Sequence, residues 1–91
     1  MTKNYEQEIF KLVQFFDNNR LPYTLEYLFG GYKFAPASQE WDVICHDFSY
    51  GHELGLLELM GSLIREDIED DEVEGWLTAE TIIERMGMSN G

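Results

Sequence analysis

Between residues 23 and 48 the apolar residues alternate with polar ones, and glycine and proline interrupt the alternation. A period of two is typical of β-strands with one buried face. Gly30-Gly31 tolerates positive φ at both positions of a tight hairpin turn. The pattern therefore predicts an antiparallel three-stranded meander. Its strands cover residues 23–29, 32–35 and 41–48, with a turn at Gly30-Gly31 and a loop over residues 36–39.

Apolar residues at helical spacing flank this alternating stretch. Residues 4–18 carry one broad apolar face at i, i+3, i+4 and i+7, which predicts a first helix. Residues 49–64 predict a second, leucine-rich helix with Ser49 as its N-cap. Gly55 and Gly61 inside it each cost about 1 kcal/mol relative to alanine. Thr78 is expected to cap a third helix over residues 79–86.

The predicted fold is α+β: a three-stranded antiparallel meander with helices packed on one face, in the order α-β-β-β-α-α. The length of 91 residues and the apolar fraction of 44% predict a single domain over residues 1–87, followed by a disordered tail at 88–91. The single cysteine, Cys45, fits a reducing compartment. No signal-peptide pattern is present, and the longest apolar stretch, at 54–64, is too short to span a bilayer. We expect a soluble, cytoplasmic protein.

The net charge of −12 comes entirely from residues 40–91. Residues 1–39 hold four acidic and four basic residues, whereas residues 40–91 hold fourteen acids against Arg65 and Arg85. Such a surface repels nucleic acid and anionic membranes and attracts basic protein surfaces. The charge therefore argues against direct nucleic-acid binding and in favour of a basic protein partner.

Half of this acidity lies in one stretch, EDIEDDEVE at residues 66–74, with seven carboxylates in nine positions. An EF-hand loop starting at Asp67 would need glycine at its sixth position and glutamate at its twelfth, and the sequence has Glu72 and Thr78 there. Three interpretations remain open: a solvated acidic segment, a weak divalent-cation site, and a recognition surface for a basic partner.

The other candidates for chemistry are better explained by structure. Cys45 and His46 are neighbours on a predicted strand and face opposite sides, so they cannot act together. His46 and His52 lack the spacing of a zinc site, and Gly30-Gly31 lacks the context of a phosphate loop. No nucleophile elbow marks a hydrolase. We therefore expect no enzymatic activity, no metal and no cofactor.

The segments CHDFSYGHELGLLELMG (45–61) and VEGWLTAETIIERM (73–86) resemble small uncharacterised proteins of phages and other bacterial mobile elements. The shared pattern is a C-H-x-x-S-Y-G turn, a G-L-L-E-x-M-G helix, an acidic spacer and E-G-[WY]-L-T-A-E before a short helix. Some small acidic proteins in that group look like inhibitors of host defence, including anti-CRISPR proteins. The resemblance implies action in the host bacterial cytoplasm and maps no functional residue beyond the acidic segment.

Charge and resemblance together predict a non-enzymatic protein that occupies a basic nucleic-acid-binding surface of a partner, most concretely of a CRISPR-Cas nuclease. An RNA-guided nuclease lines its channel with Lys and Arg, which carboxylates can engage in place of phosphates. The alternative is a structural or assembly module of a phage that forms a homodimer through the leucine-rich segment 54–64. The predicted partner-binding residues are Glu66, Asp67, Glu69, Asp70, Asp71, Glu72 and Glu74, with Trp76 and Tyr50 as aromatic anchors.

Overall fold

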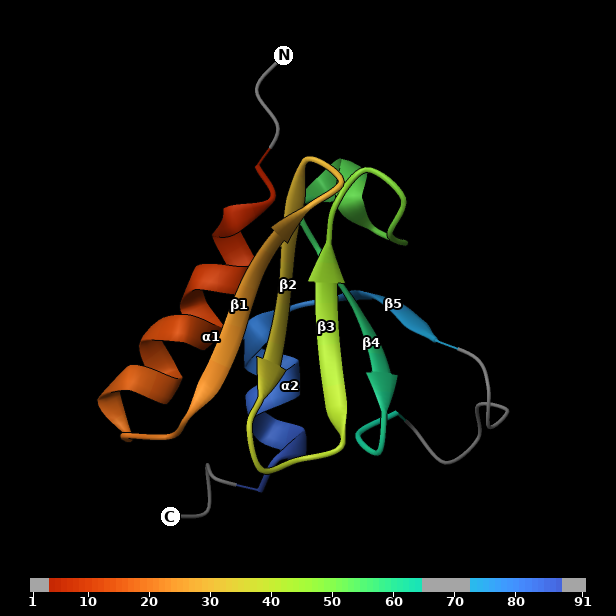
Figure 1. Ribbon diagram of the computed structural model, residues 1–91. Coiled ribbons are helices and arrows are strands. Elements are labelled where there is room, and N and C mark those ends of the chain that lie inside the picture. The colour runs from red at the N-terminus through yellow and green to blue at the C-terminus, as the bar shows by residue number, and fades with distance from the viewer. Residues whose placement is uncertain (1–3, 65–72, 88–91) are drawn as a thin grey trace.

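A five-stranded antiparallel sheet forms the centre of the molecule and carries two α-helices (Figure 1). The computed structural model describes residues 4–64 and 73–87. The strands lie in the order β1-β2-β3-β4-β5, so neighbours in sequence are neighbours in the sheet. The predicted α+β class is confirmed, whereas the prediction of three strands and three helices is wrong. The elements are α1 (Glu6–Asn18), β1 (Tyr23–Leu28), β2 (Gly31–Pro36), β3 (Trp41–Cys45), the 3-10 helix η1 (His52–Leu54), β4 (Leu57–Gly61), β5 (Glu74–Leu77) and α2 (Ala79–Arg85).

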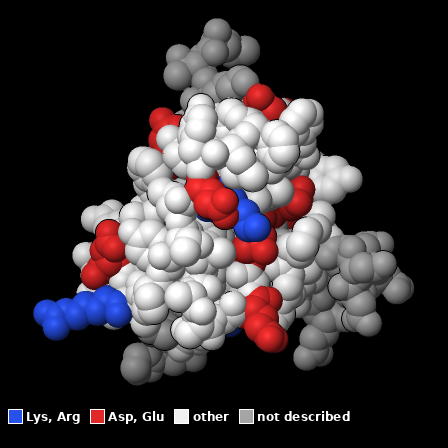
Figure 2. All heavy atoms as spheres, viewed as in Figure 1, with Lys and Arg blue, Asp and Glu red and all other residues white. Residues whose placement is uncertain are grey.

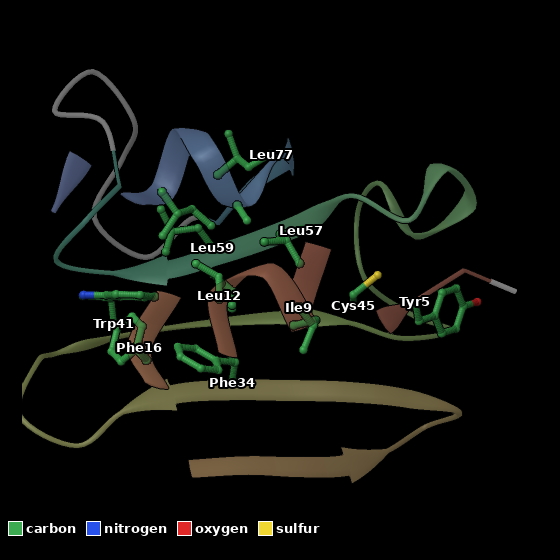
Figure 3. Packing of buried hydrophobic residues seen from close by; sticks show 13 residues of the cluster. Tyr5, Ile9, Leu12, Phe16, Phe34, Trp41, Cys45, Leu57, Leu59 and Leu77 are labelled. Atoms are coloured by element: carbon green, nitrogen blue, oxygen red, sulfur yellow. The ribbon is translucent and has the colours of Figure 1, made fainter. Parts of the chain in front are cut away.

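The core lies between one face of the sheet and the two helices (Figure 3). Phe16 of α1 meets Phe34 of β2 edge to face, with ring centroids 4.8 Å apart. Val43 of β3 and Ile82 of α2 are fully buried in the same cluster. The predicted alternation in the third strand is confirmed, because Trp41, Val43 and Cys45 are the buried positions. The helices thus cover one face of the sheet, as the apolar patterns indicated.

The first hairpin turns one residue earlier than predicted. Leu28 pairs with Gly31, so the two turn residues are Phe29 and Gly30, with φ of 50° and 77°. Gly31 instead belongs to β2, where a Cβ would lie 2.0 Å from the carbonyl oxygen of Cys45. Gly31 therefore permits the close approach of β2 to β3. The two turn residues with positive φ are Phe29 and Gly30, rather than Gly30 and Gly31 as predicted.

Residues 49–64 do not form the predicted helix. Gly51, Gly55 and Gly61 all have positive φ, which breaks the segment into a turn, η1 and β4. Within β4, Leu57 and Leu59 point into the core two residues apart, which is the period of a strand. A short apolar run fits the period of a helix or that of a strand. Here the glycines, which a helix would tolerate at a cost, adopt the positive φ that turns of the chain require.

The third strand ends earlier than predicted because the chain turns after it. β3 ends at Cys45, three residues before the predicted end. Ser49 does not cap a helix; its Oγ accepts from the backbone N of His46 and donates to the backbone O of His46, each at 3.0 Å. This hydrogen-bonded turn reverses the chain after β3. At the other end of the molecule, the predicted Thr78 cap is confirmed, because its Oγ1 accepts from the backbone N of Thr81.

Strand β5 has no counterpart in the prediction. Leu57 pairs with Leu77 and Leu59 with Glu74, with a register shift between them. The predicted disordered tail at 88–91 lies outside the described residues.

Candidate protein-binding surface at Tyr50 and Trp76

The structure brings together two of the residues that the sequence nominated for partner binding. Tyr50, in the turn after β3, stacks on Trp76 of β5, with ring centroids 5.6 Å apart and planes inclined by 22°. Each side chain remains 57% exposed. Six of the nominated acidic residues, Glu66, Asp67, Glu69, Asp70, Asp71 and Glu72, lie outside the described residues.

Two close approaches between the turn and β5 build this aromatic pair. A Cβ at Gly75 would lie 2.5 Å from the Cβ of Tyr50, and a Cβ at Gly51 would lie 3.0 Å from the backbone N of Trp76. The glycines therefore let the turn cross directly over β5. The Oε1 of Glu58, a 93%-buried residue of β4, accepts from the backbone N of Tyr50 at 2.8 Å and fixes the turn to the sheet.

The backbone of Trp76 adopts an unusual conformation. Its φ is +57°, in the left-handed region that glycine prefers, and it sits beside the register shift between β4 and β5. Left-handed geometry costs a residue with a Cβ roughly 1–2 kcal/mol. Because the indole is more than half exposed, core packing does not explain why tryptophan occupies this position.

Glu74 is the one acidic residue of the run at 66–74 that the structure describes, and an ion pair connects it to the fold. Its two carboxylate oxygens accept from the guanidinium of Arg85 in α2 at 2.6 and 2.7 Å, and its side chain is only 11% exposed. Arg85 also donates to the backbone O of Leu63 at 3.3 Å. The ion pair between Glu74 and Arg85 connects β5 to α2, and the Arg85 hydrogen bond to Leu63 adds the segment that follows β4. Glu74 therefore holds in place the start of β5, the strand that carries Trp76.

On the face shown in Figure 2, the described acidic side chains appear as separate small groups on a mainly uncharged surface. In the sequence, the charge is concentrated at residues 66–72, which precede β5 in the chain, and Trp76 follows residue 72 by four positions.

A buried polar cluster that sequence reasoning missed lies elsewhere, at the start of α1. The hydroxyl of Tyr5 donates to Oδ1 of Asp47 at 2.7 Å and lies 3.0 Å from Nδ1 of His52. Burial, reinforced by the Asp47 carboxylate, raises the pKa of Tyr5 to about 12. A general base or nucleophile at neutral pH needs the opposite shift, so the cluster fits a structural role. No spacing signal links Tyr5 to residues more than forty positions away.

The cysteine and the remaining histidine also serve the fold. Cys45 is fully buried, and desolvation raises the pKa of its thiol to about 11, which keeps it in the unreactive thiol form. His46 is buried and follows the end of β3, and its Nδ1 accepts from the backbone N of Phe48 at 3.1 Å. Across residues 4–64 and 73–87, no three His, Cys, Asp or Glu side chains gather as a metal site would require.

A second exposed aromatic group lies near the β1–β2 turn. Phe29 and Phe48 are 58% and 75% exposed and meet with centroids 5.4 Å apart. Within the part of the chain that the structure describes, the rings of Phe29 and Phe48 contact each other and His46 but neither Tyr50 nor Trp76. This group therefore offers a matched comparison for experiments on that pair.

No family model matches this chain, and no curated protein or solved structure matches it either. Among the described residues, no helix has the length and apolar character needed to cross a membrane.

Proposed function

We propose that this protein is a non-enzymatic acidic binding protein that occupies a basic nucleic-acid-binding surface of a protein partner. The most concrete form of the proposal is an inhibitor of a CRISPR-Cas nuclease. The observation that carries it is the exposed stack of Tyr50 on Trp76, with Trp76 two residues after a stretch of seven carboxylates in nine positions. Trp and Tyr are enriched among the residues that dominate the binding energy of protein interfaces.

The strain at Trp76 supports this interpretation. Unfavourable backbone geometry persists where the surroundings enforce it, and it is concentrated at functional sites. Here Gly75, Gly51 and the Glu58 hydrogen bond enforce it, and the result is an indole held in one orientation at the surface. A fixed aromatic side chain loses little conformational entropy when a partner binds.

The charge supports the choice of a basic partner. A guanidinium or ammonium group of the partner can lie on the open face of Trp76 and gain about 0.5–2 kcal/mol from the ring. The neighbouring carboxylates would meet the Lys and Arg residues that normally neutralise phosphates. Association driven in this way is fast and weakens as salt rises.

The test is inhibition of DNA cleavage by a panel of purified, guide-loaded CRISPR-Cas nucleases. The variants are Trp76→Ala and Tyr50→Ala, with Phe48→Ala as a matched truncation of an exposed aromatic outside the pair. We expect inhibition of one nuclease class by the wild type and by Phe48→Ala, with at least a tenfold loss for Trp76→Ala, since losing a hot-spot residue costs about 2 kcal/mol or more. Equal inhibition by all variants would exclude the aromatic pair as the anchor.

A further inference from the structure

The edge of the sheet at β1 has open backbone hydrogen-bonding groups. Among the described residues, β1 pairs only with β2. Helix α1 contacts β2 and β3, and the four central residues of β1 are exposed. A free strand edge is a template for the addition of another strand, and proteins usually protect it with charges, proline or a bulge. Within β1, Glu26 is the only charged residue, and the pairing with β2 is regular throughout.

The backbone orientation along β1 follows from its pairing with β2. The carbonyl of Pro22 accepts from Ala37, and Pro36, which has no N–H, lies opposite Tyr23. Because orientation alternates along an antiparallel strand, the even-numbered residues of β1 direct their N–H and C=O groups to β2. The backbone groups of Tyr23, Leu25 and Tyr27 therefore face the open edge.

The same three residues carry their side chains on the helix-covered face. Tyr23 still contacts α1, because its hydroxyl donates to Oδ1 of Asp17 at 3.0 Å and its ring meets Phe16. Leu25 and Tyr27 are the exposed members. Leu25 lies opposite the core residue Phe34, and Tyr27 opposite Tyr32. Leu25 is nevertheless 37% exposed and Tyr27 72% exposed. The edge thus combines open backbone groups with uncovered apolar side chains.

From this edge we infer that two copies of the chain associate through antiparallel pairing of β1 with β1, which joins their sheets into one sheet of ten strands. The charge distribution favours a second copy as the occupant. Residues 1–39 are neutral, whereas the rest of the chain carries −12. β1 and β5 are opposite edges of the sheet, so this pairing keeps the two β5 edges at the far ends of the dimer.

Symmetry and chemistry select one register. A two-fold axis perpendicular to the sheet keeps every side chain on its own face, so a residue must lie opposite one of the same parity. An axis at Leu25 places Leu25 opposite its copy and Tyr23 opposite Tyr27 of the second copy. An axis at Glu26 would place two carboxylates directly opposite each other, which destabilises a strand pair. The Leu25 register also turns all three outward-facing residues into hydrogen-bonded pairs.

Cysteine cross-linking tests this register. In a hydrogen-bonded pair the two Cα atoms lie about 5.5 Å apart, within disulfide range. We expect Leu25→Cys to form a disulfide dimer rapidly under mild oxidation. The matched controls are Thr24→Cys and Glu26→Cys, whose copies would lie about 8 Å apart, too far to bridge. Native Cys45 is fully buried and does not interfere. Equal cross-linking of all three variants would overturn the register and the proposal.

Sedimentation of the unmodified chain tests the association itself. We expect a species of twice 10.6 kDa whose population rises with protein concentration and with salt, because salt screens the repulsion between acidic copies. Leu25→Pro removes an N–H that faces the open edge, which a β1 edge position tolerates, and should give a folded monomer. Leu25→Lys, which opposes two ammonium groups, is the second disruptive variant. A wild-type monomer at every concentration and salt level, or a dimer that survives both substitutions, would contradict the inference.

Discussion

The two edges of the sheet differ in what they present to a partner. β1 has six residues in regular register with β2, and its open side consists of backbone groups. β5 has four residues, a register shift against β4 and a left-handed residue at Trp76. An irregular, short edge is closed to strand addition. The β5 edge therefore offers side chains, the indole above all, whereas the β1 edge offers hydrogen bonds.

Charge follows the same division. The sequence up to residue 39, which includes β1, is neutral, and the chain beyond it is strongly acidic. Repulsion between like charges leaves the β1 side as the one that another copy can approach. The β5 side instead attracts cationic surfaces. Under the two proposals made above, one small sheet separates two kinds of association by placing them at opposite edges.

The largest expected effect concerns the stability of the core that supports both edges of the sheet, and it can be measured on the protein without a substitution. Burial raises the pKa of Cys45 from 9.0 to about 11, and burial with the Asp47 hydrogen bond raises the pKa of Tyr5 from 10.0 to about 12. A raised folded-state pKa gives stability that is complete below the unfolded value and lost as pH rises through the folded value. Urea unfolding should show constant stability from neutral pH to about pH 9 and a steep loss from there to pH 12.

The matched variant is Tyr5→Phe, which lacks the hydroxyl that donates to Asp47. It should be less stable at neutral pH and lose less stability between pH 10 and 12. Parallel pH profiles for wild type and Tyr5→Phe would show that the Tyr5 cluster does not stabilise the fold.

The next effect should be larger near the β5 edge than near the β1 edge. Glu8 of α1 is 3% exposed, and its Oε1 accepts from the backbone N of Ala79 at 2.8 Å, while Lys11 donates to Oε2 at 3.0 Å. Glu8→Ala should cost about 2–3 kcal/mol, because a buried N–H loses a charged acceptor. Amide exchange should accelerate in α2 and β5 and much less in β1 and β2. The exposed Glu6→Ala is the control, and an equal cost for both variants would contradict this role of Glu8.

The same group predicts a dependence on acid. Burial acts to raise the pKa of Glu8, but the hydrogen bonds from Ala79, Lys11 and Gln7 outweigh it and hold the pKa below 4.5. A lowered folded-state pKa gives stability above the unfolded value that is lost as pH falls through the folded value. The stability gap between wild type and Glu8→Ala should therefore narrow below pH 4.5; a gap that stays constant into strong acid would count against this explanation.

A smaller effect concerns the stability of the β5 edge alone. Glu74→Gln weakens the fork-shaped pair with Arg85 and should cost about 1–2 kcal/mol, since a mostly buried guanidinium loses a charged partner. Glu84→Gln, at an exposed position of α2, is the control and should be nearly neutral. Chemical denaturation measures both, and a neutral Glu74→Gln would show that the pair does not hold β5 in place.

The smallest effect tests the strain at Trp76. Trp76→Gly and Trp76→Ala both remove the stack on Tyr50, but only glycine relieves the positive φ. The glycine variant should be the more stable of the two by about 1 kcal/mol, as measured by urea unfolding. If alanine proved equal or better, the left-handed geometry would not be a source of strain.

The first half of the fold could be predicted from the sequence because its local signals agree. Helix α1, the hairpin and the buried face of β3 each have one clear period and clear breakers. The turn was misplaced by one residue because two adjacent glycines serve different needs: Gly30 takes positive φ, and Gly31 approaches the Cys45 carbonyl. Only the contact with β3, which is tertiary, distinguishes them.

The second half could not be predicted because its signals conflict. The run from Leu56 to Ile64 fits a helix by leucine spacing, yet Leu57 and Leu59 are strand positions in the structure. Pairing with β5 favours the strand over the helix for this run. The four residues of β5 show no strand pattern in the sequence, where they follow an acidic stretch. The predicted leucine-rich helix at 54–64 is absent for the same reason, and the two leucines of β4 are in the core. Homodimer formation through this segment stays a prediction.

The candidate site was partly accessible from sequence. Tyr50 and Trp76 were nominated as aromatic neighbours of the acidic run, and the structure stacks them. The glycines that build the stack, Gly51 and Gly75, give no signal without the knowledge that the two segments cross. The role of Glu74 as the partner of Arg85 is likewise visible only in the fold.

The central proposal is that the acidic run at residues 66–74, together with Tyr50 and Trp76, takes the place of nucleic acid on a basic protein. The most direct measurement is displacement of a labelled DNA target from guide-loaded CRISPR-Cas nucleases, followed by fluorescence anisotropy at about 50 and 200 mM salt. We predict displacement from one nuclease class, weaker at the higher salt, and abolished when Asp70, Asp71 and Glu72 are all replaced by lysine in a chain that still folds. Displacement that survives this charge reversal, or no displacement from any nuclease, would contradict the account.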